Sequence, residues 1–176
     1  TRAKQSLATL MDISSPRGRY ELVISSAPFQ VIVDYAHSPH GLEIVLQEAR
    51  RQVSLKHGEL LVCYGCGGDR DRLKRPLMAS VVSRLADYSV ITNDNPRTED
   101  PFQIVEDIKE GLVVNHDFDI ELDRKKAIKH ICLRAKKYDM VLIVGKGHES
   151  FQIIGQDKYP FCDVDITQTV LTNMGY

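Results

Sequence analysis

Apolar residues in this chain follow two alternating patterns. Continuous apolar runs, as at residues 60–64 and 140–144, are typical of strands buried on both faces. Between such runs, apolar residues recur every three or four positions, as in residues 39–53, which is the spacing of an amphipathic helix. The alternation predicts an α/β fold, with a Rossmann-like, mostly parallel sheet and helices on both of its faces.

The pattern and the turn residues together give the extent of each predicted element. Strands are expected at residues 20–24, 30–34, 60–64, 88–92, around 120, and at 140–144, 151–154 and 159–161. Helices are expected at residues 39–53, 76–86, 101 to about 111, 124–137 and about 165–173. Short turns separate the first two strands and the last two, which predicts one or two hairpins at the edge of the sheet.

Composition limits the partners that we expect. The 176 residues carry a net charge of −1, and the basic residues are interspersed with acids, so nucleic acid is not an expected partner. No signal peptide is recognisable and no run approaches the ~18 apolar residues of a membrane span, so no membrane partner is expected. Four cysteines without the density of a disulfide scaffold indicate a reducing, cytoplasmic setting. Cys63 and Cys66 lack the surroundings of a redox or zinc pair, so we interpret them as packed side chains and expect no metal site.

Four polar or glycine-rich segments directly follow predicted strands. They are Asp34-Tyr35-Ala36-His37, Gly65-Cys66-Gly67-Gly68-Asp69-Arg70-Asp71, Asp94-Asn95-Pro96-Arg97 and Gly145-Lys146-Gly147-His148-Glu149. Ligands of open α/β sheets bind outside the carboxyl ends of the strands. If the strands are parallel, all four segments lie on one rim and form one site.

Each segment has a functional and a plainer interpretation. Arg97 offers planar donors that match a carboxylate and Pro96 stiffens its turn, but an Asn-Pro loop is also an ordinary turn. The glycine segment is either a tight turn or a phosphate cradle, and it lacks the residue order of a P-loop. His37 is either a base or a partner of nearby backbone, and Lys146 is either solvated or in contact with an anion.

In wording and order, the four segments and the stretch Lys74-Arg75-Pro76-Leu77-Met78 resemble the C-terminal domain of the Mur ligases, most closely of those that add diaminopimelate. The resemblance runs from about Gly18 to the last residue. It implies that residues 18–176 form the amino-acid-binding domain, and that residues 1–17 are the end of a central domain and a linker, partly disordered. It also implies a monomer in the cytoplasm.

The resemblance implies an ATP-dependent amide ligase of peptidoglycan synthesis. In that reaction ATP phosphorylates the D-glutamate γ-carboxylate of UDP-MurNAc-L-Ala-D-Glu, and the amine of meso-diaminopimelate attacks the acyl phosphate. ATP and Mg²⁺ would be held mainly by the central domain. This chain is therefore expected to bind the amino acid and close over ATP, to contain no catalytic residue, and to be inactive alone.

The resemblance also assigns residues to two sites. The amino-acid site falls on Arg70, Asp94, Asn95, Pro96, Arg97, Gly145 and Glu149, and the ATP contacts fall on Arg19, Asp34, Tyr35 and His37. The far end of diaminopimelate carries a carboxylate, suited to Arg70, Asn95 and Arg97, and an ammonium, suited to Glu149 and the Gly145 carbonyl. L-Lysine lacks the distal carboxylate and would leave Arg97 without a partner.

Two other functions stay open at this point. A ligase that adds L-lysine or glutamate, as folylpolyglutamate synthetases add glutamate, would share the chemistry. A glutamate-adding enzyme would not need Arg97 and Glu149 paired around a distal zwitterion. A non-catalytic α/β module would instead use the same rim to hold a nucleotide or to dock a protein.

Overall fold

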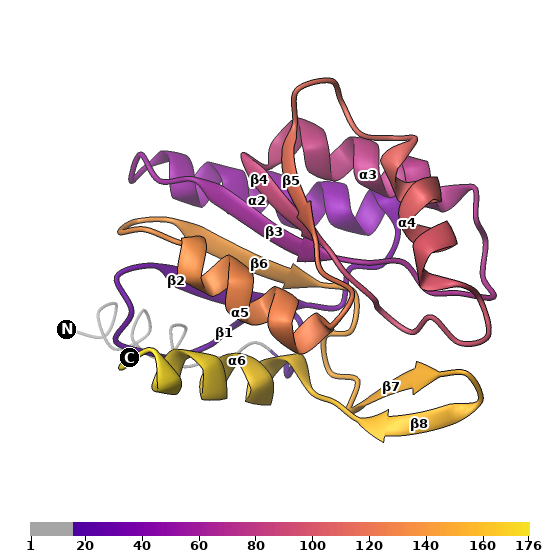
Figure 1. The fold of residues 1–176 in the computed structure, drawn as a ribbon. Coiled ribbons are helices and arrows are strands. Elements are labelled where there is room, and N and C mark those ends of the chain that lie inside the picture. The colour runs from indigo at the N-terminus through magenta and orange to yellow at the C-terminus, as the bar shows by residue number, and fades with distance from the viewer. Residues whose placement is uncertain (1–15) are drawn as a thin grey trace, which may run out of the picture.

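The computed structural model describes residues 16–176 (Figure 1). The disorder expected in residues 1–17 therefore concerns a segment that lies, up to residue 15, outside the described residues. The strands are β1 Glu21–Leu22, β2 Gln30–Asp34, β3 Leu60–Tyr64, β4 Tyr88–Ile91, β5 Asp117–Ile120, β6 Met140–Val144, β7 Phe151–Ile154 and β8 Asp157–Pro160. The helices are α2 Pro39–Ser54, α3 Lys74–Leu85, α4 Pro101–Lys109, α5 Arg124–Arg134 and α6 Asp163–Asn173.

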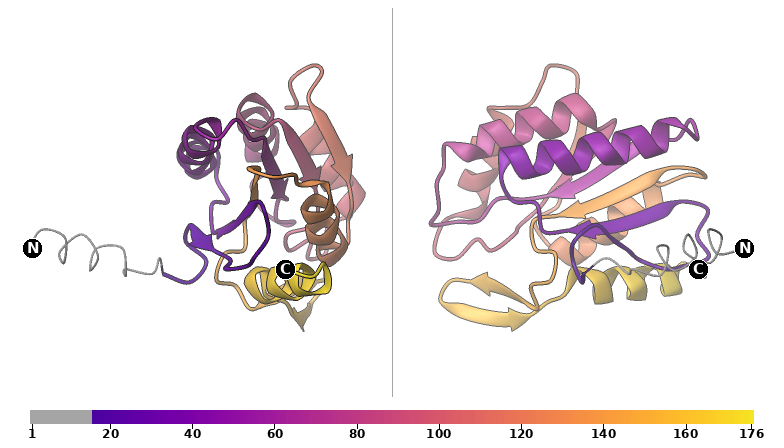
Figure 2. Two further views of the ribbon diagram at one scale, coloured as in Figure 1. Left: turned by 90° about the vertical axis from the view of Figure 1, so that its left-hand side faces the viewer. Right: turned by 180° about the vertical axis from the view of Figure 1, so that it is seen from behind.

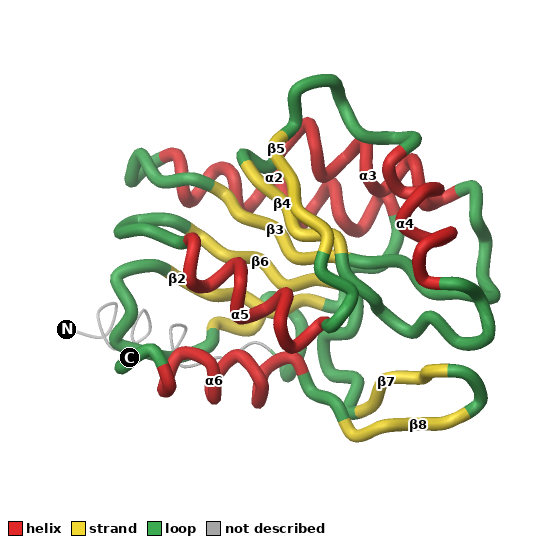
Figure 3. Tube along the Cα trace, viewed as in Figure 1, coloured by secondary structure: helices red, strands yellow, loops and turns green. Residues whose placement is uncertain are grey.

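Six strands form one sheet in the order β1-β2-β6-β3-β4-β5 (Figure 3). All neighbours are parallel except β1, which pairs antiparallel with β2. Strands β7 and β8 form a separate antiparallel hairpin beside the carboxyl ends of the parallel strands (Figure 1). The predicted α/β class, the mostly parallel sheet and the two hairpins are confirmed.

Helices cover both faces of the sheet, as the side view in Figure 2 shows. Helices α2 and α3 lie on one face, where Leu42 and Met78 belong to the same core cluster as Val62 of β3. Helices α5 and α6 lie on the other face, where Ile128 and Leu171 belong to a second cluster. Side chains along β3 and β6 alternate between the two clusters, which is why these two strands are apolar at every position.

The cysteines follow the packing interpretation. Cys63 and Cys66 are both free and both buried. Burial raises the pKa of each thiol to about 12, so neither is a thiolate at neutral pH. The pair therefore contributes to the core as small apolar side chains.

Element boundaries differ from the predicted ones for local reasons. Strand β1 is shorter than residues 20–24 because Tyr20 has a φ of 49° and donates its N–H to the Asp34 carboxylate (2.7 Å). Helix α5 ends before the predicted residue 137 because the N–H of Lys136 donates to the Asp139 carboxylate (2.7 Å). Helix α2 begins as predicted, with Ser38 accepting a hydrogen bond from the N–H of Gly41 (3.2 Å). None of the helices within residues 16–176 combines the length and apolar character needed to cross a membrane.

Candidate functional site

The four polar segments follow four neighbouring strands. Strands β2, β6, β3 and β4 lie side by side and parallel, so their carboxyl ends meet at one rim. This confirms the arrangement predicted from the sequence. The rim encloses a cleft of about 340 Å³, lined by Tyr35, His37, Gly67, Arg70, Lys74, Asp94, Asn95, Arg97, Gly145 and Glu149.

Most of the residues assigned from the resemblance line this cleft. Every predicted amino-acid contact except Pro96 is present, and Pro96 is buried within its loop. Of the predicted nucleotide contacts, Tyr35 and His37 line the cleft, whereas Arg19 and Asp34 do not. The structure therefore places part of the predicted nucleotide site, Tyr35 and His37, in the same cleft as the predicted amino-acid site.

Hydrogen bonds from the hairpin β7–β8 fix the backbone of the segment from Asp94 to Arg97. Arg97 has a φ of 53°, and its N–H donates to Ile153 (3.1 Å) while its carbonyl accepts from Gly155 (2.7 Å). Gln152 of β7 donates its side-chain amide to the Asp94 carbonyl (2.8 Å). A left-handed arginine is a strained conformation that neighbouring contacts must enforce. The hairpin supplies those contacts and so aims the Arg97 side chain.

The guanidinium of Arg97 is only partly used by the protein. Its Nη1 donates to the carbonyls of Gly68 (2.8 Å) and Asn95 (3.4 Å). Within residues 16–176, neither Nε nor Nη2 has a hydrogen-bond partner. These nitrogens can therefore donate side by side to a carboxylate in the cleft.

The glycine segment packs directly on the Asp94–Arg97 loop. The N–H of Gly68 donates to the Asn95 carbonyl (2.9 Å), and a Cβ built on Gly68 would overlap the Pro96 carbonyl. The buried Arg75 donates to the Gly67 carbonyl (3.1 Å) and fixes the segment from below. The glycine segment thus positions the Asp94–Arg97 loop by backbone contact, and its own residues Gly67 and Arg70 also line the cleft.

Replacing Gly68 by alanine tests this backbone contact. Because the new Cβ meets a carbonyl that cannot move freely, we expect the free energy of unfolding to fall by about 1–3 kcal/mol in urea denaturation. Gly67→Ala is the matched control, since its Cβ would meet the flexible end of the Arg97 side chain (3.1 Å) instead. Equal losses for the two variants would contradict the proposed backbone contact.

A buried cluster links the Asp94–Arg97 and Gly145–Glu149 segments. Lys146 donates to Asn95 Oδ1 (3.0 Å) and to Glu149 Oε2 (2.9 Å), and the Asn95 amide also donates to Glu149 Oε2 (3.0 Å). Burial would raise the pKa of Glu149, but the hydrogen bonds from Lys146 and Asn95 outweigh it and lower that pKa. Glu149 is therefore an ionised acceptor at neutral pH.

Asp94 is a second acceptor in the cleft. The residue is only 7% exposed, and burial raises the pKa of its carboxyl. Its carboxylate has no hydrogen-bond partner in the described part of the chain, and the nearest cation, Lys146 Nζ, is 3.9 Å away. A Cβ built on Gly145 would lie 2.7 Å from Asp94 Oδ2, and Gly145 has a φ of 114°. Only glycine suits that position.

The other end of the cleft is aromatic and cationic. The centre of the Tyr35 ring lies 4.6 Å from that of the His37 ring and 4.8 Å from that of the His148 ring. The guanidinium carbon of Arg19 lies 5.7 Å from the centre of the Tyr35 ring. The Asp34 carboxylate accepts hydrogen bonds from the N–H groups of Tyr20 and Ala36, both at 2.7 Å. It therefore holds the loop after β2 against the segment before β1.

His37 and Lys146 illustrate how the open interpretations resolve. His37 Nδ1 lies 2.9 Å from the Tyr35 carbonyl, which agrees with the plainer interpretation, a bond to nearby backbone. Lys146 is fully buried, so it is neither a solvated lysine nor on the surface of the cleft. Lys74, which the sequence assigned to no site, lines the cleft and donates to the His37 carbonyl (3.1 Å).

An ion-pair cluster under the glycine segment makes stability depend on pH. Hydrogen bonds from Arg72, together with those from Gln103 and Arg75, hold the pKa of Asp107 below its usual range. This stabilisation is complete above the unfolded pKa of about 4 and is lost as the pH falls through the lower, folded pKa. We expect the free energy of unfolding to fall more steeply below pH ~4 in the wild type than in Asp107→Asn. Urea denaturation between pH 7 and pH 3 measures this, and parallel curves would contradict it.

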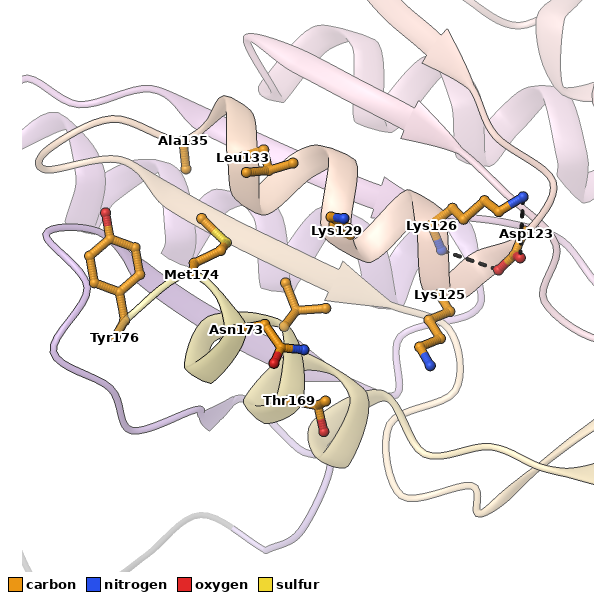
Figure 4. Close-up of a pocket in the computed structure, with 11 residues that line it drawn as sticks. Asp123, Lys125, Lys126, Lys129, Leu133, Ala135, Thr169, Asn173, Met174 and Tyr176 are labelled. Carbon is orange, nitrogen blue, oxygen red and sulfur yellow. Dashed lines mark hydrogen bonds and ion pairs between the residues drawn. The ribbon is translucent and has the colours of Figure 1, made fainter.

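A larger cavity of about 780 Å³ lies away from the rim, between α5 and α6 (Figure 4). Lys125, Lys126 and Lys129 line one part of it, and Leu133 and Met174 line another. None of the residues assigned from the sequence contributes to it. The larger cavity and the polar cleft at the rim therefore lie at different places. We take the cleft as the candidate functional site because hydrogen-bond donors and acceptors converge in it.

Comparison with known proteins agrees with the resemblance. The family model for the Mur ligase, glutamate ligase domain, matches residues 18–147. Curated UDP-N-acetylmuramoyl-L-alanyl-D-glutamate–2,6-diaminopimelate ligases from Fusobacterium nucleatum and Synechococcus elongatus are 44% and 49% identical over 94% and 89% of the chain. The chain spans only 34% and 31% of these two relatives.

Solved structures show the same relationship. One structure of a UDP-N-acetylmuramoyl-L-alanyl-D-glutamate–2,6-diaminopimelate ligase is 36% identical, has a TM-score of 0.87, and is matched over 99% of this chain and 37% of its own. A murein peptide ligase from Psychrobacter arcticus is 22% identical with a TM-score of 0.65, over 96% of this chain and 32% of its own, and shares the fold. The chain therefore belongs to the Mur ligase family.

Proposed function

We propose that this chain is the C-terminal, amino-acid-binding domain of an ATP-dependent ligase that adds meso-diaminopimelate to UDP-MurNAc-L-Ala-D-Glu. One observation carries the proposal: the residues assigned to the amino acid, apart from Pro96, line a single cleft that offers the free Nε and Nη2 of Arg97 beside the ionised carboxylate of Glu149. The names of the relatives supply the reaction, and the donors and acceptors of this cleft match the distal zwitterion of that amino acid. We assign residues 18–176 to this domain and residues 1–17 to the end of the central domain and the linker.

The proposed roles follow from which atoms are free. Arg97 Nε and Nη2, with the exposed Arg70, bind the distal carboxylate. Glu149 and Asp94, with the Gly145 carbonyl, bind the distal ammonium. A zwitterion held at both groups leaves the reacting amine at the other end of the molecule, free to attack.

ATP supplies the phosphoryl group that activates the acceptor carboxylate. The Tyr35 ring and the exposed Arg19 suit a base or phosphate at the edge of the cleft, and we assign them to the nucleotide together with His37 and Asp34. No cluster of His, Cys, Asp or Glu within residues 16–176 suits a metal ion. As the family resemblance implies, we assign Mg²⁺ and the triphosphate mainly to the central domain of the enzyme, and we place the enzyme in the cytoplasm as a monomer.

Steady-state kinetics of the complete ligase tests the proposal. The assay supplies ATP and UDP-MurNAc-L-Ala-D-Glu and measures ADP release with meso-diaminopimelate, L-lysine or L-glutamate. We expect meso-diaminopimelate to be preferred by at least about 10²-fold in kcat/KM, because L-lysine lacks the distal carboxylate and L-glutamate lacks the distal amine. Equal rates with L-lysine would favour a lysine-adding ligase, and ADP release with none of the three would favour a binding module.

A further inference from the structure

Lys146 is a fully buried lysine directly beneath the cleft. Its side chain has 0% exposed area, and its ammonium lies 2.9 Å from Glu149 Oε2, 3.0 Å from Asn95 Oδ1 and 3.9 Å from Asp94 Oδ1. Removing an ammonium from water costs several kcal/mol unless its new partners satisfy it. The position therefore needs a reason, and all three of these neighbours are proposed ligand contacts: Asn95 carries an amide, and Glu149 and Asp94 carry carboxylates.

The first consequence concerns Asn95. Its Oδ1 accepts from Lys146 (3.0 Å) and from the N–H of Ile153 (2.9 Å), so a flipped amide would turn its NH₂ toward two donors. The amide therefore keeps its nitrogen toward Glu149 and the cleft. Nδ2 uses one hydrogen for Glu149 (3.0 Å) and has a second hydrogen for a ligand oxygen.

The second consequence concerns Glu149. Its Oε2 accepts hydrogen bonds from both Lys146 and Asn95, while Oε1 has no hydrogen-bond partner among the residues that the structure describes. The charged groups that face this carboxylate are Lys146 of its own loop and Arg97 of the opposite loop, with Asp94 next to Lys146. The hydrogen bonds from Lys146 and Asn95, together with the charges of Lys146 and Arg97, lower the pKa of this carboxyl and keep it ionised despite its burial. Oε1 is thus a charged acceptor with a fixed direction.

We propose that Lys146 is a positioning residue that sets the polarity of the amino-acid site, turning Asn95 into a donor for carboxylate and Glu149 into an acceptor for ammonium. The identity of the ligand rests on the proposed function above. The arrangement of Lys146, Asn95 and Glu149 does not depend on that function. Because one ammonium contacts both Asn95 and Glu149, its loss affects recognition of both ends of the zwitterion together.

Discrimination between amino acids tests this role in the complete ligase. L-Lysine lacks the distal carboxylate of meso-diaminopimelate, and 2-aminopimelate lacks its distal amine. In Lys146→Met we expect the preference for meso-diaminopimelate over each analogue, as a ratio of kcat/KM, to fall at least about tenfold. Lys146→Gln keeps a donor and should keep part of both preferences. Lys129→Met, an exposed lysine of α5, is the control and should leave both ratios unchanged.

A merely structural role predicts a different result. If Lys146 only supports the fold, Lys146→Met lowers kcat/KM by the same factor for all three amino acids and both ratios stay constant. Constant ratios in Lys146→Met would overturn the proposal. If the methionine variant does not fold, constant ratios in Lys146→Gln would overturn it instead.

An NMR titration separates this proposal from the proposed function. The pH midpoint of the Glu149 carboxyl carbon is measured in this 176-residue chain, with Glu149→Gln for assignment. We expect Lys146→Met to move the midpoint to higher pH and Lys129→Met to leave it in place. An unmoved midpoint would overturn the positioning role. A moved midpoint in a protein whose complete form does not use meso-diaminopimelate would leave the positioning role intact and reject the proposed ligand.

Discussion

Replacing Arg124 by methionine should destabilise the folded chain by about 3–5 kcal/mol. Arg124 begins α5 and pairs with Asp163 at the start of α6, Nη2 to Oδ2 at 2.8 Å, with both side chains 0% exposed. Methionine removes the cation and leaves the Asp163 carboxylate buried without its partner. Breaking one half of a buried pair costs far more than the pair contributes, because the remaining charge cannot be hydrated.

The same substitution should loosen the rim. Arg124 also donates to the Val144 carbonyl (2.9 Å) and the Asn93 carbonyl (3.4 Å), which directly precede two of the binding segments. These carbonyls lose a buried donor in Arg124→Met. We therefore expect the hydrogen-exchange protection of residues 93–97 and 144–149 to fall further than that of α3 on the opposite face of the sheet.

Urea denaturation of matched variants measures the effect on stability. Lys129→Met changes an exposed lysine of the same helix to the same residue and should stay within about 0.5 kcal/mol of the wild type. The double variant Arg124→Met/Asp163→Leu removes both charges and should recover much of the loss. A loss below about 1 kcal/mol in Arg124→Met, or strictly additive losses in the double variant, would show that the pair is not a buried, coupled unit.

The sequence predicted the fold and the place of the site because both depend on local patterns. Buried parallel strands are apolar at every position, and the polar segments that follow them must share one rim once the strands are parallel. Strands β3 and β6 are apolar at every position and β2 and β4 are largely so, and each of the four is followed by a polar segment, so the cleft and most of its lining residues could be anticipated.

The supporting contacts could not be anticipated, because they join residues far apart in the sequence. Arg124 meets Asp163 across 39 positions and Asn95 meets Ile153 across 58, and neither residue type is unusual where it stands. Lys146 lies between two glycines, a setting that is equally typical of a solvated loop. Only the three-dimensional arrangement shows that this lysine is buried and that hairpin β7–β8 braces the opposite loop.

Arg97→Ala should lower kcat/KM of the complete ligase for meso-diaminopimelate by about 10²–10³-fold, which corresponds to a lost charge-assisted, two-point contact. With L-lysine, which has no distal carboxylate, the same variant should change kcat/KM by no more than about threefold. The expected result is thus a loss of preference, measured as ADP release with each amino acid.

The left-handed backbone at Arg97 provides an internal control. At a φ of 53°, glycine is relaxed and alanine is strained, whereas both remove the guanidinium. If the side chain carries the effect, Arg97→Gly and Arg97→Ala lose the same preference, and they differ only in thermal stability. Arg97→Lys keeps the charge but not the planar pair of donors, so it should recover only a small part of the rate.

Arg84→Ala, a change at an exposed arginine near the end of α3, controls for the loss of one positive charge and should leave both amino acids unaffected. Two outcomes would count against the assigned role. Equal losses with meso-diaminopimelate and L-lysine would mean that Arg97 supports the loop and does not bind the distal carboxylate. A loss in Arg97→Ala that is absent in Arg97→Gly would assign the effect to the strained backbone, and the free Nε and Nη2 would then need another ligand.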